Sequence, residues 1–224
     1  MAMSSSLNEI VEFAENPEPR CPCVLLLDTS GSMHGKAIDT LNEGLWLFKL
    51  EVCKDALAAR RVEVAVVTFD DDVKVPQPFV SIEDFEPPVL TAQGLTHMGG
   101  AINTALDLLQ VRKRQYKANG ITYYRPWVFM ITDGEPQGEP DEAVAAAARR
   151  IREDEQAKRV AFFAVGVEGA NMERLRGISA RHPVRLRGLN FRELFVWLSG
   201  SMQTVARSRP DEQVLLAPAG WASV

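Results

Sequence analysis

Four apolar runs separated by stretches with helical periodicity constrain the fold of this chain more than any other feature. The runs cover residues 24–27, 62–69, 127–132 and 160–167, and none of them alternates strictly between apolar and polar residues. A continuous apolar run is typical of a strand that is buried on both faces of a parallel sheet. Because such strands alternate here with helices, we expect a doubly wound, Rossmann-like α/β domain with helices on both faces of the sheet.

Apolar residues three and four positions apart mark the segments between these runs as amphipathic helices. The helical stripes cover residues 38–52, 102–109, 143–151 and 191–205. Residues 73–79 instead alternate and contain two prolines, which favours a strand at the edge of the sheet. The sequence therefore predicts about six strands, mostly parallel, with one short antiparallel edge strand.

The chain has 224 residues, of which 46% are hydrophobic, and this suits one domain with short tails. We expect residues 1–20 to form a polar N-terminal lead-in, 21–206 the folded domain and 207–224 a C-terminal tail. The helical pattern stops after Arg207, which is typical of a loose tail. A tryptophan is costly to leave in water, however, so the docking of Trp221 on the domain or on a partner stays open as the alternative.

Charge and cysteine content exclude several classes of function. With 25 basic and 30 acidic residues the net charge is -5, which is the wrong sign for a protein that binds nucleic acid through bulk electrostatics. No apolar run approaches the length that crosses a bilayer, so no membrane partner is expected. The first twenty residues lack the pattern of an export signal, and three cysteines do not suggest a disulfide framework. These observations favour a cytoplasmic location.

Oxygen-bearing side chains follow two of the apolar runs directly. Asp28, Ser30 and Ser32 come after the first run, Asp133 comes after the third, and Thr96 lies at the start of the helix between them. Ligands of open α/β sheets bind beyond the carboxyl ends of the strands, so we expect these five side chains to meet there. Two carboxylates and three hydroxyls suit a divalent cation, with Mg²⁺ the first choice and Mn²⁺ or Ca²⁺ as alternatives.

The predicted site has an open coordination position. Without metal, the carboxylates of Asp28 and Asp133 repel each other, and a cation relieves this repulsion while it presents the open position to an acidic side chain of a partner. Unpaired N–H groups at the start of the Thr96 helix are expected to help orient such an anionic group. Asp70, Asp71 and Asp72 suggest a second cation site, but a turn into the edge strand explains them better. We therefore predict a binding module without catalysis.

An enzyme is the alternative function. Residues 31–36 lie between a strand and a helix as a phosphate-binding P-loop does, but only three residues separate Gly31 from Gly35, and Ala37 follows Lys36. A phosphotransferase that uses Asp28 as nucleophile requires a second acid two residues later, where Ser30 stands. No Gly-x-Ser-x-Gly elbow of a serine hydrolase is present. A nucleotide-binding phosphotransfer enzyme that uses the segment from Gly31 to Lys36 remains the alternative.

Three separated pieces of the sequence resemble the metal-ion-dependent adhesion site of von Willebrand factor A domains. They are residues 28–32, Thr96 and residues 133–134, and the resemblance extends over about residues 22–205. It implies that Ser30, Ser32 and Thr96 supply hydroxyl ligands, while Asp28 and Asp133 bind the metal directly or through water. His97 departs from the pattern, because a proline is expected after the metal-site threonine.

Neighbouring segments are similar to one branch of that family, the TerY-like proteins of bacterial tellurium-resistance and stress-response loci. These segments are residues 41–45, 123–127, 163–169 and 220–222. In that branch the domain is associated with a metal-dependent protein phosphatase of the 2C type and with a Ser/Thr kinase. The resemblance therefore implies a phosphatase and a kinase as partners.

Overall fold

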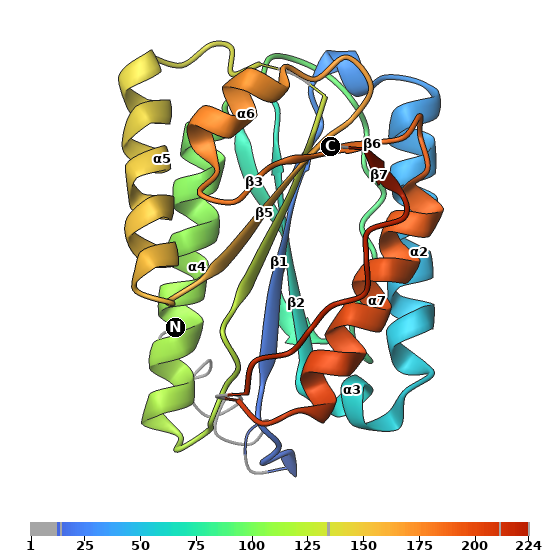
Figure 1. The fold of residues 1–224 in the computed structure, drawn as a ribbon, viewed down its shortest axis with the longest axis vertical. Coiled ribbons are helices and arrows are strands. Elements are labelled where there is room, and N and C mark those ends of the chain that lie inside the picture. The colour runs from blue at the N-terminus through green and yellow to red at the C-terminus, as the bar shows by residue number, and fades with distance from the viewer. Residues whose placement is uncertain (1–12, 14, 134, 211, 224) are drawn as a thin grey trace.

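A mixed β-sheet forms the middle layer of the protein (Figure 1). The structure is a computed structural model that describes residues 13, 15–133, 135–210 and 212–223. Over these residues the sheet has seven strands in the order β3-β2-β1-β4-β5-β6-β7. The strands are β1 (Cys21–Asp28), β2 (Val62–Phe69), β3 (Val73–Ser81), β4 (Trp127–Thr132), β5 (Ala161–Gly166), β6 (Val184–Leu186) and β7 (Ala222–Ser223). The inner neighbours pair in parallel, whereas β3 and β7 run antiparallel at the two edges.

Helices cover both faces of this sheet (Figure 1). In chain order they are the 3-10 helix η1 (Gly31–Met33), α2 (Lys36–Cys53), α3 (Ala56–Arg61), α4 (Met98–Ala118), α5 (Asp141–Gln156), α6 (Met172–Ile178) and α7 (Phe191–Arg207). Buried residues of α2 and α7 share one apolar cluster with Leu25 and Leu27, while those of α4 and α5 share the other with Val24 and Leu26. Alternate residues of β1 thus face opposite layers, which explains why its sequence is continuously apolar.

The predicted doubly wound α/β fold is confirmed. The parallel strands, the antiparallel edge strand β3 and the helices on both faces agree with the prediction. The tail adds β7, a second antiparallel edge strand of two residues, which is too short to give a periodic signal in the sequence. Residues 1–12 and 14 of the predicted lead-in lie outside the described residues. In the part of the chain that the structure describes, no helix is long and apolar enough to cross a membrane.

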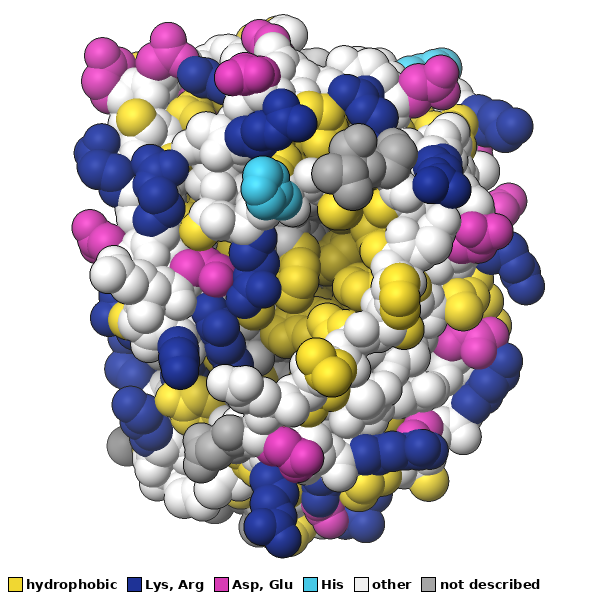
Figure 2. Space-filling view, viewed as in Figure 1, with side chains coloured by type: hydrophobic (Ala, Val, Ile, Leu, Met, Phe, Trp, Pro, Cys, Tyr) yellow, Lys and Arg dark blue, Asp and Glu magenta, His cyan; other side chains and the backbone are white. Residues whose placement is uncertain are grey.

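The C-terminal segment docks on the domain through Trp221. This side chain is buried, and its ring lies edge-on to that of Trp197 in α7 with 5.6 Å between the ring centroids. The Nε1 of Trp197 donates a hydrogen bond to the carbonyl oxygen of Ala217 at 2.8 Å. Figure 2 shows a hollow in the middle of the molecule in which apolar side chains are visible. The C-terminal segment passes through this region of the molecule in Figure 1. Of the two alternatives for Trp221, the structure therefore supports docking on the domain.

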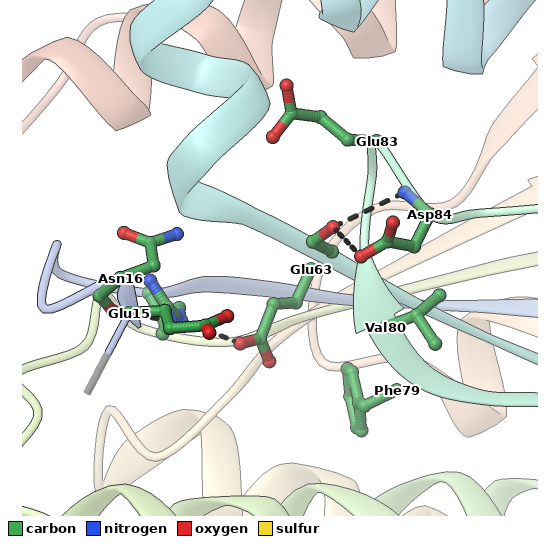
Figure 3. Close-up of a pocket in the computed structure, with 9 residues that line it drawn as sticks. Glu15, Asn16, Glu63, Phe79, Val80, Glu83 and Asp84 are labelled. Carbon is green, nitrogen blue, oxygen red and sulfur yellow. Dashed lines mark hydrogen bonds and ion pairs between the residues drawn. The ribbon is translucent and has the colours of Figure 1, made fainter. Parts of the chain in front are cut away.

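A buried ion cluster occupies the amino ends of β1 and β2. The carboxylate of Glu63 pairs with Arg20 and with Arg112, at 2.8 Å from the Nε of each, and it also accepts a hydrogen bond from the hydroxyl of Tyr116. All four side chains are buried. A cavity of about 400 Å³ lies beside Arg20 and Glu63 and is further lined by acidic residues such as Glu15 (Figure 3). This cluster lies at the end of the sheet opposite to the predicted metal site.

Candidate metal centre

Asp28 forms the buried floor of the site. It is the last residue of β1, and its side chain is fully shielded from solvent. Its Oδ1 accepts a hydrogen bond from the backbone N–H of Ser30 at 2.8 Å, and its Oδ2 accepts one from the hydroxyl of Thr132 at 2.5 Å. Because β4 is the neighbour of β1 in the sheet, the last residue of β4 can hold this carboxylate in place. Thr132 is thus a further residue of the site, and it is not among those that the sequence predicts.

Ser30, Ser32 and Asp133 continue the site from this floor toward the surface. The two serine hydroxyls lie 3.0 Å apart, and the hydroxyl of Ser32 donates to Oδ1 of Asp133 at 2.8 Å. The short helix η1 turns the chain tightly here, and the N–H of Gly31 donates to the carbonyl oxygen of Gly94 at 3.0 Å. Ser30 is buried, Asp133 is partly buried and Ser32 is exposed. The structure therefore joins four of the five predicted site residues in one group that opens to solvent.

Thr96, the fifth predicted residue, is held next to this group by its backbone. It is buried, and it forms an antiparallel bridge with Gln137, in which the N–H of Gln137 donates to the carbonyl oxygen of Thr96 at 3.0 Å. Gln137 follows Asp133 along the same connection between β4 and α5. The segment of Thr96 is also joined to the loop that follows β1, because the N–H of Gln93 donates to the carbonyl oxygen of Thr29. Gly134, part of the motif, lies outside the described residues.

The acidic residues 70–72 form a turn that supports the site. Oδ1 of Asp70 accepts a hydrogen bond from the N–H of Asp72, and its Oδ2 accepts one from the hydroxyl of Thr29. Oδ1 of Asp71 accepts from the N–H of Leu95 at 2.8 Å, next to Thr96. These carboxylates hold the loops around the site, which agrees with the turn that the sequence favoured over a second cation site.

One expectation about the helix after Thr96 is corrected by the structure. The N–H groups at the start of α4 were expected to be unpaired and to orient an anionic ligand. Instead, the carboxylate of Glu139 accepts hydrogen bonds from Gly99 at 2.6 Å and from Gly100 at 3.2 Å. Glu139 is 39 or more positions away in the sequence, so local pattern analysis gave no signal for this contact.

The two carboxylates of the site have raised pKa values. Burial raises the pKa of Asp28 to about 6, against hydrogen bonds from Ser30 and Thr132 that lower it, and the negative charge of Asp133 raises it further. Burial also raises the pKa of Asp133, while the hydrogen bond from Ser32 lowers it. Both shifts mean that ionised carboxylates are destabilised here when no positive charge is nearby.

The donor set fits a divalent cation. Carboxylate and hydroxyl oxygens are hard ligands, and a cation offsets the cost of ionising Asp28 and Asp133. Within the described ranges, no group of three or more His, Cys, Asp or Glu side chains is placed to hold a metal. The side-chain oxygens that the site offers a cation are therefore the two carboxylates and the hydroxyl groups beside them.

Metal-free wild-type protein is expected to lose stability relative to Asp28→Asn as the pH rises from about 4 to 7. The folded pKa of about 6 exceeds the ordinary value of 3.8, so the protonated carboxyl stabilises the fold below about pH 4, and this contribution is lost as the pH rises through 6. The expected change is about 3 kcal/mol. Urea denaturation in the presence of chelator measures it, with Asp39→Asn, on the exposed first turn of α2, as control. A difference between wild type and Asp28→Asn that does not vary with pH would contradict this account.

The fold and the site together define a class of protein. The protein is a doubly wound α/β domain. At the carboxyl ends of its parallel strands it carries an Asp-x-Ser-x-Ser group, a threonine and a second aspartate. The model of the von Willebrand factor type A domain matches residues 23–193, which is more than half of the chain. The chain belongs to this family.

Solved structures with the same fold share little sequence with this chain. A von Willebrand factor type A protein from Catenulispora acidiphila is 18% identical with a TM-score of 0.59, and the match covers 83% of this chain and 43% of that one. The pilus adhesin SpaC from Lactobacillus rhamnosus GG is 12% identical with a TM-score of 0.66, and the match covers 84% and 30%. Proximal thread matrix protein 1 from the mussel byssus, in a structure with a zinc-occupied MIDAS motif, is 17% identical with a TM-score of 0.54, and the match covers 83% and 48%. This chain thus spans less than half of each of these three proteins, and no curated protein matches it.

Proposed function

We propose that this protein is a metal-dependent protein interaction module without catalytic activity. Asp28, Ser30, Ser32, Thr96 and Asp133 hold one divalent cation, and an acidic side chain of a partner completes its coordination. The observation that carries this proposal is the hydrogen-bonded group of Asp28, Ser30, Ser32 and Asp133 at the carboxyl ends of β1 and β4. Two carboxylates with raised pKa values in such a group favour a bound cation over an empty site.

Each residue has a defined part in this proposal. When bound, the cation supplies positive charge and an open coordination position. Thr132 and the backbone of Ser30 fix the orientation of Asp28, and Ser32 does the same for Asp133. Because Ser32 is exposed while Asp28 is buried, the site faces solvent on one side only, and a partner approaches from there.

Mg²⁺ is the proposed cation. Ligand sets made only of oxygen, with two formal negative charges, suit a six-coordinate cation that keeps some of its waters. Mn²⁺ and Ca²⁺ share this preference for oxygen and are the alternatives. The zinc-occupied MIDAS motif of the mussel protein supports the binding of a divalent cation at the corresponding position of this fold.

The proposed partners are a protein phosphatase of the 2C type and a Ser/Thr kinase in a bacterial tellurium-resistance or stress-response system. The support is the resemblance of residues 41–45, 123–127, 163–169 and 220–222 to TerY-like proteins. A cytoplasmic location is part of this proposal, and the odd and small number of cysteines, three in the chain, supports it. The acidic net charge of -5 supports a protein partner rather than a nucleic acid.

The alternative, nucleotide binding through residues 31–36, receives no support from the geometry. A P-loop offers its backbone N–H groups to phosphate. Here the N–H groups of Gly31, Met33 and His34 already donate to carbonyl oxygens of the chain. The carboxylates of Asp28 and Asp133 close to this loop would also repel a phosphate group.

Binding of the purified phosphatase and kinase to the immobilised protein tests the proposed function. In Mg²⁺ at least one of them is expected to bind, and chelator is expected to abolish binding. Ser32→Ala is expected to weaken binding at least about tenfold, because it removes a ligand and the hydrogen bond that orients Asp133. Thr204→Ala, which removes an exposed hydroxyl on α7, is the matched control. Equal binding in Mg²⁺ and in chelator would refute a metal-bridged contact.

A further inference from the structure

Two loops that carry metal-site residues are joined to each other by direct contacts. One loop contains Thr96 and leads into α4, and the other follows Asp133 and leads into α5. The backbone bridge between Thr96 and Gln137 is the first contact between them. The carboxylate of Glu139, which accepts hydrogen bonds from Gly99 and Gly100, is the second. We call these two contacts the loop clamp.

Glu139 acts here as the cap of a helix to which it does not belong. The residue before α4 is His97, and its side chain makes no capping hydrogen bond. The N–H groups of Gly99 and Gly100 would lack a partner in the first turn of α4, and Glu139 supplies one carboxylate oxygen to each. A carboxylate at the amino end of a helix is also favoured by the helix dipole. Removal of Glu139 therefore affects the start of α4 as well as the loop that follows Asp133.

Close packing shows that the two loops fit each other along the clamp. A Cβ atom at Gly99 would lie 2.9 Å from Oε2 of Glu139 and 3.0 Å from the backbone nitrogen of Val144, so only glycine allows this approach. Gly138 has a φ of 80°, and a Cβ atom there would lie 2.6 Å from Nε2 of His97. His97, which departs from the family pattern, thus packs against the second loop. The clamp holds the loop of Thr96 against residues 137–139 of the loop that follows Asp133.

We propose that Glu139 is a positioning residue that sets the preference of the metal site for Mg²⁺ over Ca²⁺. This inference rests on the proposed function, because it requires that Thr96 and Asp133 share one cation. Mg²⁺ demands a nearly octahedral set of ligands at about 2.1 Å, whereas Ca²⁺ accepts six to eight ligands at about 2.3–2.6 Å in flexible arrangements. A rigid link between the loops of Thr96 and Asp133 favours the cation with the stricter geometry. A loosened link therefore lowers the affinity for Mg²⁺ more than the affinity for Ca²⁺.

Calorimetric titration of Mg²⁺ and of Ca²⁺ into metal-free protein tests the inference. Glu139→Ala is expected to weaken Mg²⁺ binding about tenfold or more, as is usual when a residue that orients a ligand is lost, and Ca²⁺ binding clearly less. Glu139→Gln retains an oxygen for Gly99 and is expected to lie between wild type and Glu139→Ala. Amide hydrogen exchange of Gly99 and Gly100, measured in metal-free protein, is expected to be faster in Glu139→Ala, and this readout needs no cation.

Glu142→Ala is the matched control, because Glu142 is an exposed acid in the first turn of α5, three residues from Glu139. It removes the same charge from the same region without touching the clamp. The inference about Glu139 is overturned if Glu139→Ala lowers the affinities for Mg²⁺ and Ca²⁺ by the same factor. It is also overturned if Glu142→Ala changes the ratio of the two affinities as much as Glu139→Ala does. In both cases the metal site itself stands. If wild type binds neither cation, the proposed function itself fails.

Discussion

Asp28→Asn is expected to weaken Mg²⁺ binding by about 100-fold or more, which corresponds to about 2.7 kcal/mol. The substitution removes one of the two negative charges of the site and one carboxylate oxygen. Loss of a residue that only orients a ligand typically costs 10- to 100-fold, so the loss of a ligand should cost at least as much. The fold should persist, because asparagine has the shape of aspartate and can still accept the hydrogen bond from the N–H of Ser30. Titration calorimetry measures the affinity.

The same variant separates metal binding from folding. Metal-free Asp28→Asn is expected to be more stable than wild type above about pH 6, because burial disfavours the ionised form of Asp28. A variant that binds no metal and yet unfolds at a higher urea concentration cannot owe its loss of binding to misfolding. Asp39→Asn, with its exposed side chain, should match wild type in both measurements. If Asp28→Asn bound Mg²⁺ as tightly as wild type, Asp28 would not be a ligand.

Glu63→Ala is expected to lower the free energy of unfolding by about 3–5 kcal/mol. The substitution removes the carboxylate that pairs with the buried guanidinium groups of Arg20 and Arg112, and that accepts the hydrogen bond from the hydroxyl of Tyr116. Removal of one partner from a buried, hydrogen-bonded ion pair is among the most destabilising changes in a folded protein. Urea denaturation in Mg²⁺ measures the effect, with the exposed acid Glu83 replaced by alanine as control.

The Mg²⁺ affinity of the folded Glu63→Ala protein provides a second test. Glu63 is the second residue of β2, whereas Asp28 lies at the carboxyl end of β1, so the two groups occupy opposite ends of the sheet. The affinity should therefore remain within about twofold of wild type, as expected for distant and independent sites. A loss of stability below about 1 kcal/mol would mean that Glu63 does not offset the two arginines.

The framework of the fold could be predicted because its signals are local. The stripe of residues 38–52 places one face of α2 in the core, and the continuous run 62–69 is buried over its whole length in β2. The two residues of β7 have no periodicity of their own, and they pair with β6 next to the docked ring of Trp221. Long-range docking of this kind is set by tertiary contacts, so the sequence left both alternatives for Trp221 open.

The candidate site likewise contains residues that have a local signal in the sequence and residues that have none. Asp28, Ser30 and Ser32 form one short motif directly after a strand, and the order of strands in an α/β sheet brings Asp133 to the same edge. Thr132 and Glu139 escaped prediction because their partners are more than 38 positions away and a lone threonine or glutamate carries no pattern. The raised pKa of Asp28 also depends on burial by the folded chain, which no local motif reports.

Calorimetric titration of Mg²⁺ into metal-free wild-type protein is the most direct test of the metal site at the carboxyl ends of β1 and β4. We expect one cation to bind per chain at neutral pH, and Asp28→Asn in the same buffer to show no comparable binding. Mn²⁺ should compete for the same position, because it shares the oxygen ligands of Mg²⁺. Absence of Mg²⁺, Mn²⁺ and Ca²⁺ binding by the folded wild-type protein, or equal Mg²⁺ binding by Asp28→Asn, would contradict the assignment of this rim as a metal site.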